Sequence, residues 1–149
     1  MEKIIDKINI LYGAAVTLFV AAFGQYWYLF VGFLVLNVVD YITGIIKSRI
    51  LHKESSQKGL KGIFKKIGYW IVIAIAFFVS VCFKNMGGII GIDLSLTVLF
   101  GWFTLATLII NEIRSILENL VQCGVVVPEF LIKGLEVTQG LIEKHTDGE

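Results

Sequence analysis

The sequence predicts an all-α integral membrane protein with four, or three, transmembrane helices followed by cytoplasmic amphipathic helices. Hydrophobic residues make up 56% of the 149-residue chain and charged residues only 17%, and the mean hydropathy is +0.81. A soluble domain has about 45–50% apolar and about 25% charged residues. A soluble chain of this length could not bury so much apolar surface, so the bilayer is its natural solvent.

The apolar residues are gathered in four segments, at residues 8–23, 28–46, 67–83 and 94–110. The last three hold 17 to 19 residues each, close to the roughly 20 that a helix needs to cross a hydrocarbon core of about 30 Å. The first is about 24 Å long as a helix, so it either spans a locally thinned bilayer or lies partly in the interface. It also resembles a signal peptide, but Glu2 and Asp6 offset the basic charge before it, so we expect no cleavage.

Polar and aromatic residues mark the boundaries of these segments. The aromatic run Tyr26-Trp27-Tyr28 is typical of a membrane–water interface. Residues 47–66 read as a basic loop, in which Gly59 and Gly62 act as breaks. Residues 84–93 read as a short glycine-rich connection. We therefore expect the transmembrane region to cover residues 1–110.

The character of the chain changes after Ile110. Apolar residues from Ile113 to Val121 recur at i, i+3, i+4, i+7 and i+8, which predicts an amphipathic helix. Gly124 suits the position after its C-terminus, and Pro128 suits the start of a second, weaker helix that continues to residue 144. Residues 111–149 are thus predicted to form an amphipathic cytoplasmic tail.

Charge orients the predicted spans. Seven of the thirteen Lys and Arg residues fall within residues 47–66, among them Lys47, Arg49, Lys58, Lys61, Lys65 and Lys66. Because loops with excess Lys and Arg face the cytoplasm, this segment and the C-terminus should be cytoplasmic. Four spans place the N-terminus there as well, and three place it outside. The basic cluster either attracts anionic lipid or serves only to set the topology.

Asp40 is an ionisable residue inside the second apolar segment. A charge at the centre of a membrane helix costs about 2.5–3.5 kcal/mol, so Asp40 should face other helices or water, or be protonated. The candidate packing or pore residues lie around it on the same helix: Asn37, Asp40, Thr43 and Gly44. They indicate either a channel or proton-linked site or a helix-packing hydrogen bond. Its partner could be Arg114 or Lys66.

No enzyme is predicted. The sequence contains no HExxH, paired CxxC, P-loop or GxSxG motif. Its two histidines, His52 and His145, are far apart, and its two cysteines are too few for a disulfide framework. We expect no cofactor and no metal. The net charge of +1 gives no basic field for nucleic acid.

Three polar landmarks, taken in order, resemble the toxin-secretion/phage-lysis holin family of small clostridial and related holins. The first is Val39-Asp40-Tyr41-Ile42-Thr43-Gly44, and the second is the Ser56–Lys66 segment with its repeated glycines and lysines. The third provides the tail candidates Asn111, Glu112, Ser115, Glu118, Asn119, Gly124 and Pro128.

This resemblance implies a multi-pass protein of a bacterial cytoplasmic membrane that forms homo-oligomers. Such proteins open lesions that release an endolysin for host lysis, or export a large toxin, without binding the cargo stably. Their partners are membrane lipid and further copies of the chain, not nucleic acid. Two other functions stay open: a small ion or proton channel or transporter that uses Asp40, and a membrane anchor whose tail binds a soluble partner.

Overall fold

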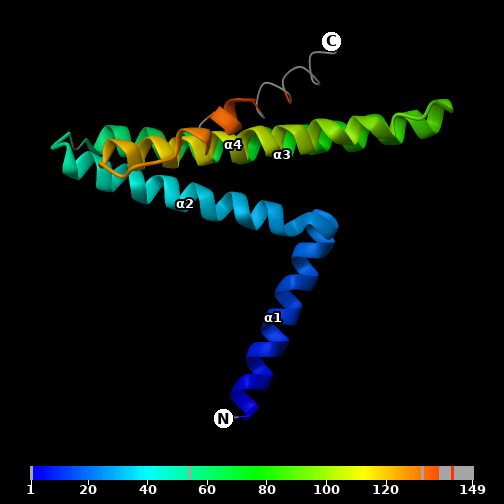
Figure 1. Cartoon of the computed structure of the whole chain (residues 1–149). Coiled ribbons are helices and arrows are strands. Elements are labelled where there is room, and N and C mark those ends of the chain that lie inside the picture. The colour runs from blue at the N-terminus through cyan, green and yellow to red at the C-terminus, as the bar shows by residue number, and fades with distance from the viewer. Residues whose placement is uncertain (1, 54, 132, 138–141, 143–149) are drawn as a thin grey trace. The chain divides into compact units, whose positions relative to one another are not determined.

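A computed structural model describes residues 2–53, 55–131, 133–137 and 142. Within these residues the secondary structure is entirely helical, which confirms the predicted all-α class. The elements are α1 (Glu2–Phe23), η1 (Gly24–Tyr26), α2 (Trp27–Ile50), α3 (Ser56–Ile90), η2 (Ser95–Thr97) and α4 (Val98–Gln122) (Figure 1). They fall into two compact units, Met1–Val35 and Leu36–Glu149, each described by itself below.

Three helices in the described part of the chain are long and apolar enough to cross a membrane. They are Trp27–Ile50, Ser56–Ile90 and Ser95–Gln122. These correspond to the second, third and fourth apolar segments of the sequence. The first predicted span, residues 8–23, lies within α1, where Asp6 and Lys7 precede it. Spanning by α1 stays a prediction.

The first unit consists of α1, η1 and the start of α2. Apolar side chains on α1 are largely exposed; Ile10 and Leu11 are both 70% exposed. At the start of α2, the rings of Tyr26 and Tyr28 meet edge to face with their centroids 6.3 Å apart. This aromatic pair lies at the predicted interface position.

The second unit is built on the packing of α3 against α4, which run side by side (Figure 1). Ile73 on α3 and Leu105 on α4 are buried between them. A Cβ at Gly101 would lie 2.6 Å from Cδ1 of Phe77, so this position admits only glycine without movement. The close approach lets the Phe77 ring meet Trp102 edge to face at 5.1 Å.

A tight connection joins α3 to α4. Gly91 has a positive φ of 74°, a conformation that glycine adopts readily, and the next amide, Ile92 N–H, donates to the carbonyl of Gly87 at 2.9 Å. Thr97 then donates from Oγ1 to the carbonyl of Ser80 on α3 at 3.2 Å. The start of α4 is thereby fixed against the end of α3.

The helices are longer than the sequence predicted, and three boundaries need correction. The basic segment 47–66 is not a loop: α2 runs to Ile50 and α3 begins at Ser56. The predicted connection 84–93 is helical through Ile90. The predicted boundary at Ile110 is not a break, since α4 continues to Gln122. The polar residues that flank the apolar segments continue the helices instead of forming loops.

The end of α4 agrees with the predicted signals. Gly124 follows it with a φ of 89°, and Val125 N–H donates to the carbonyl of Leu120 at 3.0 Å. Pro128 directly precedes the helical residues 129–131, and residues 133–137 are helical too. The remainder of the predicted second helix, up to residue 144, lies outside the described residues apart from Ile142.

Candidate functional site

Three helices of the second unit each place a charged residue at a matching depth. Asp40 comes ten residues before the end of α2, and Glu112 comes ten residues before the end of α4. Lys66 comes ten residues after the start of α3, which runs in the opposite direction. Ten helical residues rise about 15 Å. The three side chains can therefore meet.

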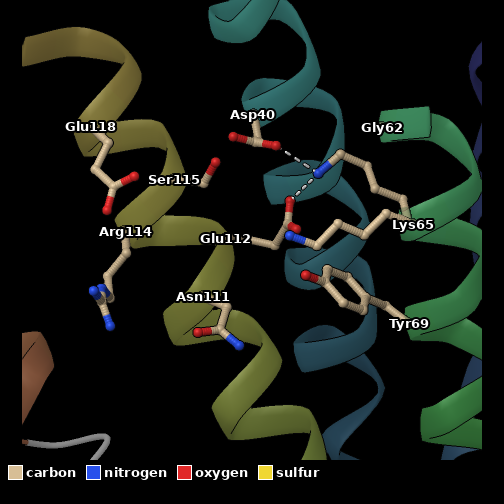
Figure 2. Close-up of a pocket in the computed structure, with 10 residues that line it drawn as sticks. Asp40, Gly62, Lys65, Tyr69, Asn111, Glu112, Arg114, Ser115 and Glu118 are labelled. Atoms are coloured by element: carbon tan, nitrogen blue, oxygen red, sulfur yellow. Dashed lines mark hydrogen bonds and ion pairs between the residues drawn. The ribbon is translucent and has the colours of Figure 1, made fainter. Parts of the chain in front are cut away.

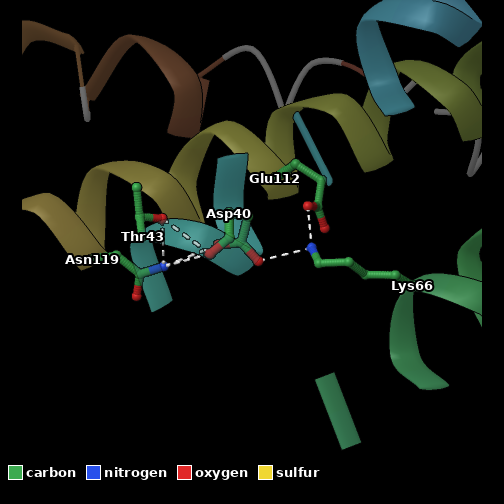
Figure 3. Close-up of polar contacts among 5 residues, drawn as sticks. All are labelled: Asp40, Thr43, Lys66, Glu112 and Asn119. Carbon is green, nitrogen blue, oxygen red and sulfur yellow. Dashed lines mark hydrogen bonds and ion pairs between the residues drawn. The ribbon is translucent and has the colours of Figure 1, made fainter. Parts of the chain in front are cut away.

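Lys66 bridges the two carboxylates. Its Nζ donates to Oδ2 of Asp40 at 2.8 Å and also to Oε2 of Glu112 (Figure 3). The side chains of Lys66 and Asp40 are 15% and 16% exposed, and that of Glu112 is only 4% exposed. One ammonium group thus holds α2 and α4 to α3 in a largely dry environment.

Asn119 adds a second connection between α4 and α2. Its Nδ2 donates to Oδ1 of Asp40 at 3.0 Å and to Oγ1 of Thr43 at 3.2 Å (Figure 3). Thr43 itself donates to the backbone carbonyl of Asp40 at 3.0 Å. Gly44 lies beneath this amide, since a Cβ there would be 3.8 Å from Nδ2 of Asn119. Both Asp40 oxygens are therefore engaged. We call Asp40, Thr43, Lys66, Glu112 and Asn119 the polar cluster.

The stabilisation that the polar cluster provides depends on its charged groups being paired with one another. Two carboxylates share one ammonium group. The Asn119 amide also stabilises the carboxylate of Asp40, which is the more exposed of the two. Removing one partner of a buried ion pair costs about 3–5 kcal/mol, because the other charge is left unpaired. The cluster therefore stabilises this helix arrangement only while all its members are present.

A pocket of about 370 Å³ opens beside the cluster (Figure 2). The tail candidates that line it come from one side of α4: Asn111, Glu112, Ser115 and Glu118. Across the pocket, Lys65 lies over the ring of Tyr69, with Nζ 5.5 Å from the centroid. Arg114 also lines the pocket, yet Figure 3 shows the Asp40 carboxylate joined to Lys66. Of the two predicted partners of Asp40, the structure selects Lys66.

The other predicted residues lie outside these contacts. Asn37 is buried one turn before Asp40. Lys47 and Arg49 lie in the last turn of α2, and Lys58 and Lys61 lie in the first turns of α3. Gly124 and Pro128 follow the end of α4.

Sequence reasoning gave Lys66 as one of two possible partners of Asp40, but it did not predict that Lys66 also binds Glu112. One signal was available: Lys66 is the last charge before the uncharged segment 67–83. A lysine at that border can turn inward only if carboxylates lie at the same depth. The Lys65–Tyr69 contact was missed as well, although their i, i+4 spacing allows it.

Among the described residues no group of three or more His, Cys, Asp or Glu side chains could hold a metal ion. The contacts of the polar cluster are those of a helix-joining network, in which Lys66 Nζ, both Asp40 oxygens and Oε2 of Glu112 are bonded to other protein groups. Together with three helices able to cross a membrane, they define an all-helical integral membrane protein whose spans are joined by a nearly buried ionic network.

The chain belongs to the bacteriophage holin family, which matches residues 17–140. It is 31% identical to a probable holin of Bacillus phage phi105 over 125 residues, which cover 84% of each chain. It is 39% identical over 129 residues to an uncharacterised protein of Listeria innocua, covering 87% of this chain and 83% of that one. An uncharacterised protein of Clostridium perfringens strain 13 is 34% identical over 136 residues, covering 91% and 93%. No solved structure matches significantly.

Proposed function

We propose that this protein is a holin that oligomerises in the bacterial cytoplasmic membrane and opens lesions large enough for a folded protein. The observation that carries the proposal is the family match over residues 17–140, which includes all three apolar helices. The relative in Bacillus phage phi105, named a probable holin, supports it. The released cargo would be an endolysin, in host lysis, or a large exported toxin.

A lesion of this size would have to form between copies. The space between α3 and α4 is filled by side chains such as Ile73 and Leu105, which are 3% and 1% exposed. The outward side of α3 is apolar; Ile71, Ile75 and Phe78 are 55%, 56% and 68% exposed. Such a surface suits lipid or a neighbouring copy. We therefore propose a homo-oligomer as the active form.

We further propose that the end of the second unit that holds Ile50, Ser56 and Gln122 faces the cytoplasm. The seven Lys and Arg residues of segment 47–66 lie at this end, while Lys84 is the one basic residue of segment 84–97. Excess Lys and Arg mark the cytoplasmic side. The residues that follow Gln122 would then be cytoplasmic, as would the N-terminus if α1 spans.

The test is induced expression of the full chain in a bacterium, together with a muralytic enzyme that has no export signal. We expect growth to stop abruptly and the culture to lyse. Osmotically protected cells should also release a large cytoplasmic fluorescent protein. An unrelated membrane protein with three spans, brought to the same membrane level, serves as the control. High membrane levels without release of folded protein would refute the proposal.

The same experiment separates the alternatives. A channel that uses Asp40 would depolarise the cells without releasing the fluorescent protein, and Asp40→Asn would abolish that depolarisation. A membrane anchor would produce neither effect, and its tail would capture a soluble partner. The contacts of Asp40 with Lys66 and Asn119 favour a packing role over an ion pathway, because both carboxylate oxygens are engaged.

A further inference from the structure

A second hollow, of about 810 Å³, shares some of its lining residues with the pocket described above. It is formed by the last turns of α2, the connection after Ile50 and the first turns of α3, with Ser115 and Asn119 of α4 at its back. We call it the basic groove. Asp40 and Lys66 line both hollows. Their ion pair therefore forms part of the wall of each hollow.

The lining of the basic groove is strongly cationic. Its basic residues are Lys47, Arg49, Lys53, Lys58 and Lys66. Among the described residues that line it, Asp40 is the one acidic residue, and its carboxylate is bound to Lys66. Four other basic residues therefore line the same hollow. Such a concentration of positive charge selects an anion.

The same groove is also apolar along its edge. Tyr41, Leu51, Leu60 and Ile63 line it, and their exposed fractions are 37%, 40%, 56% and 41%. A small hydrated anion makes no use of such surface. A ligand that satisfies both linings is an amphiphile with an anionic head and hydrocarbon tails.

The depth of the groove in a bilayer fits this ligand. On α3, Lys58 and Lys84 are 26 residues apart, a rise of about 39 Å. This nearly equals the thickness of a bilayer with its headgroups, about 40–45 Å. With Lys84 at one headgroup level, Lys58 lies at the other. Leu60 and Ile63 follow it toward the uncharged segment 67–83, where acyl chains would run.

We propose that the basic groove is a binding site for the headgroup phosphate of an anionic phospholipid, with its acyl chains against Leu60 and Ile63. This goes beyond general attraction of a basic segment to an anionic surface, because it assigns the binding to particular side chains. Lys58 lines the groove, whereas Lys61, three residues later and also exposed, does not. The two lysines form a matched pair.

The test uses the full chain in mild detergent, titrated with short-chain phosphatidylglycerol and followed by native mass spectrometry. Parallel titrations use phosphatidylcholine of the same chain length and inorganic phosphate. We expect saturable binding of one phosphatidylglycerol per chain. Phosphatidylcholine and phosphate should bind at least tenfold more weakly. Raising the salt concentration should weaken the phosphatidylglycerol complex.

Single substitutions distinguish a defined lipid-binding site from general electrostatic attraction of lipid to the basic segment. Lys58→Gln should weaken phosphatidylglycerol binding about fivefold, the usual effect of one interfacial charge, while Lys61→Gln should change it less than twofold. Leu60→Gln should weaken phosphatidylglycerol binding without changing the binding of inorganic phosphate. Circular dichroism checks that each variant remains helical, and at these exposed positions we expect no loss.

Three results would overturn the proposal. Equal losses in Lys58→Gln and Lys61→Gln would mean diffuse attraction without a site. Inorganic phosphate that bound as tightly as phosphatidylglycerol would mean an ion site that ignores the apolar edge. Displacement of the lipid by a peptide of Asp and Glu residues at similar concentration would assign the groove to an acidic protein partner. None of these results would bear on release of cargo, so the proposed function is tested separately.

Discussion

Lys66 is the residue on which the arrangement of the second unit depends most. It provides the ammonium group between two carboxylates that come from different helices. Glu112 is almost completely buried, so water replaces this partner poorly. Dispersion forces between apolar helices favour many relative positions. The ionic network favours this particular arrangement of the helices.

Replacing Lys66 by Met should lower the free energy of unfolding by about 3 kcal/mol. This is the lower end of the range for breaking a buried pair, because Lys66 and Asp40 retain some solvent exposure. Unfolding of the full chain in mixed detergent micelles, followed by circular dichroism, measures it. Lys61→Met, at an exposed position on the same helix, should change stability by less than about 0.5 kcal/mol.

A rescue distinguishes charge from packing at this position. Adding Glu112→Gln to Lys66→Met should recover part of the lost stability, because it removes one of the two unpaired carboxylates. If the double variant is less stable than Lys66→Met by the full cost of Glu112→Gln alone, the two residues act independently. That result would contradict the network.

The close contact between α3 and α4 is possible because residue 101 is glycine and has no side chain. Gly101→Ala should destabilise the protein by about 1–3 kcal/mol, since its Cβ would lie 2.6 Å from Cδ1 of Phe77. Gly68→Ala on α3 meets nothing within 4 Å and should stabilise the helix by up to about 1 kcal/mol. Detergent unfolding of both variants provides the comparison. Stabilisation by Gly101→Ala would mean that Phe77 moves aside freely.

Helices α1 to α4 all end in the same way, with a residue of positive φ just past the helix. Gly24, Gly91 and Gly124 take this place after α1, α3 and α4, and His52 takes it after α2 with a φ of 50°. There, His52 N–H donates to the carbonyl of Arg49 at 3.1 Å and Lys53 N–H to that of Ser48 at 2.9 Å. This is the Schellman pattern, and glycine suits it best.

His52→Gly should therefore raise the free energy of unfolding by about 1 kcal/mol, because a side chain in the left-handed region is strained. His52→Val should lower it by a similar amount, since branching at Cβ worsens the strain. Thermal unfolding in detergent compares them. Equal stability of the two variants would show that the turn adjusts its backbone to the residue present.

The limits of sequence reasoning appear clearly in these elements. Gly124 and Pro128 predicted the end of α4 correctly, because caps are local chemistry. Gly59 and Gly62 suggested breaks where α3 is in fact continuous, because a long helix tolerates an isolated glycine at about 1 kcal/mol. Asp40 was identified as an ionisable residue that should face other helices or water, or be protonated, but its partner depends on how α3 is rotated about its axis. No single sequence determines that rotation.

At the scale of the molecule, the charged and uncharged parts of the second unit are separated along the helix axes. The uncharged parts of α3 and α4, residues 67–83 and 98–111, lie on one side of the polar cluster. The basic turns around Lys47 and Lys58 lie on the other. The cluster thus marks the level at which a bundle suited to lipid becomes a bundle suited to headgroups and water.

This separation predicts the topology. In a chain with Cys82 and Cys123 replaced by Ala, a cysteine at Asn85 should react with a membrane-impermeant maleimide in intact spheroplasts. A cysteine at Ser56 should react only after permeabilisation, because the basic end faces the cytoplasm. Labelling is done at low expression, before growth arrest, with an unlabelled cytoplasmic protein as the integrity control. The reverse pattern would overturn the proposed orientation.

The same approach decides whether α1 spans. With Ser56 inside, α2 enters the cytoplasm at Ile50, so its Trp27 end lies at the outer surface. If α1 crosses the bilayer, a cysteine at Lys3 is cytoplasmic and should react only after permeabilisation. We expect this outcome, because 16 uncharged residues from Ile8 to Phe23 reach about 24 Å, a mismatch that a bilayer accommodates by thinning. Labelling of Lys3→Cys in intact spheroplasts would instead place α1 on the outer surface and reduce the protein to three spans.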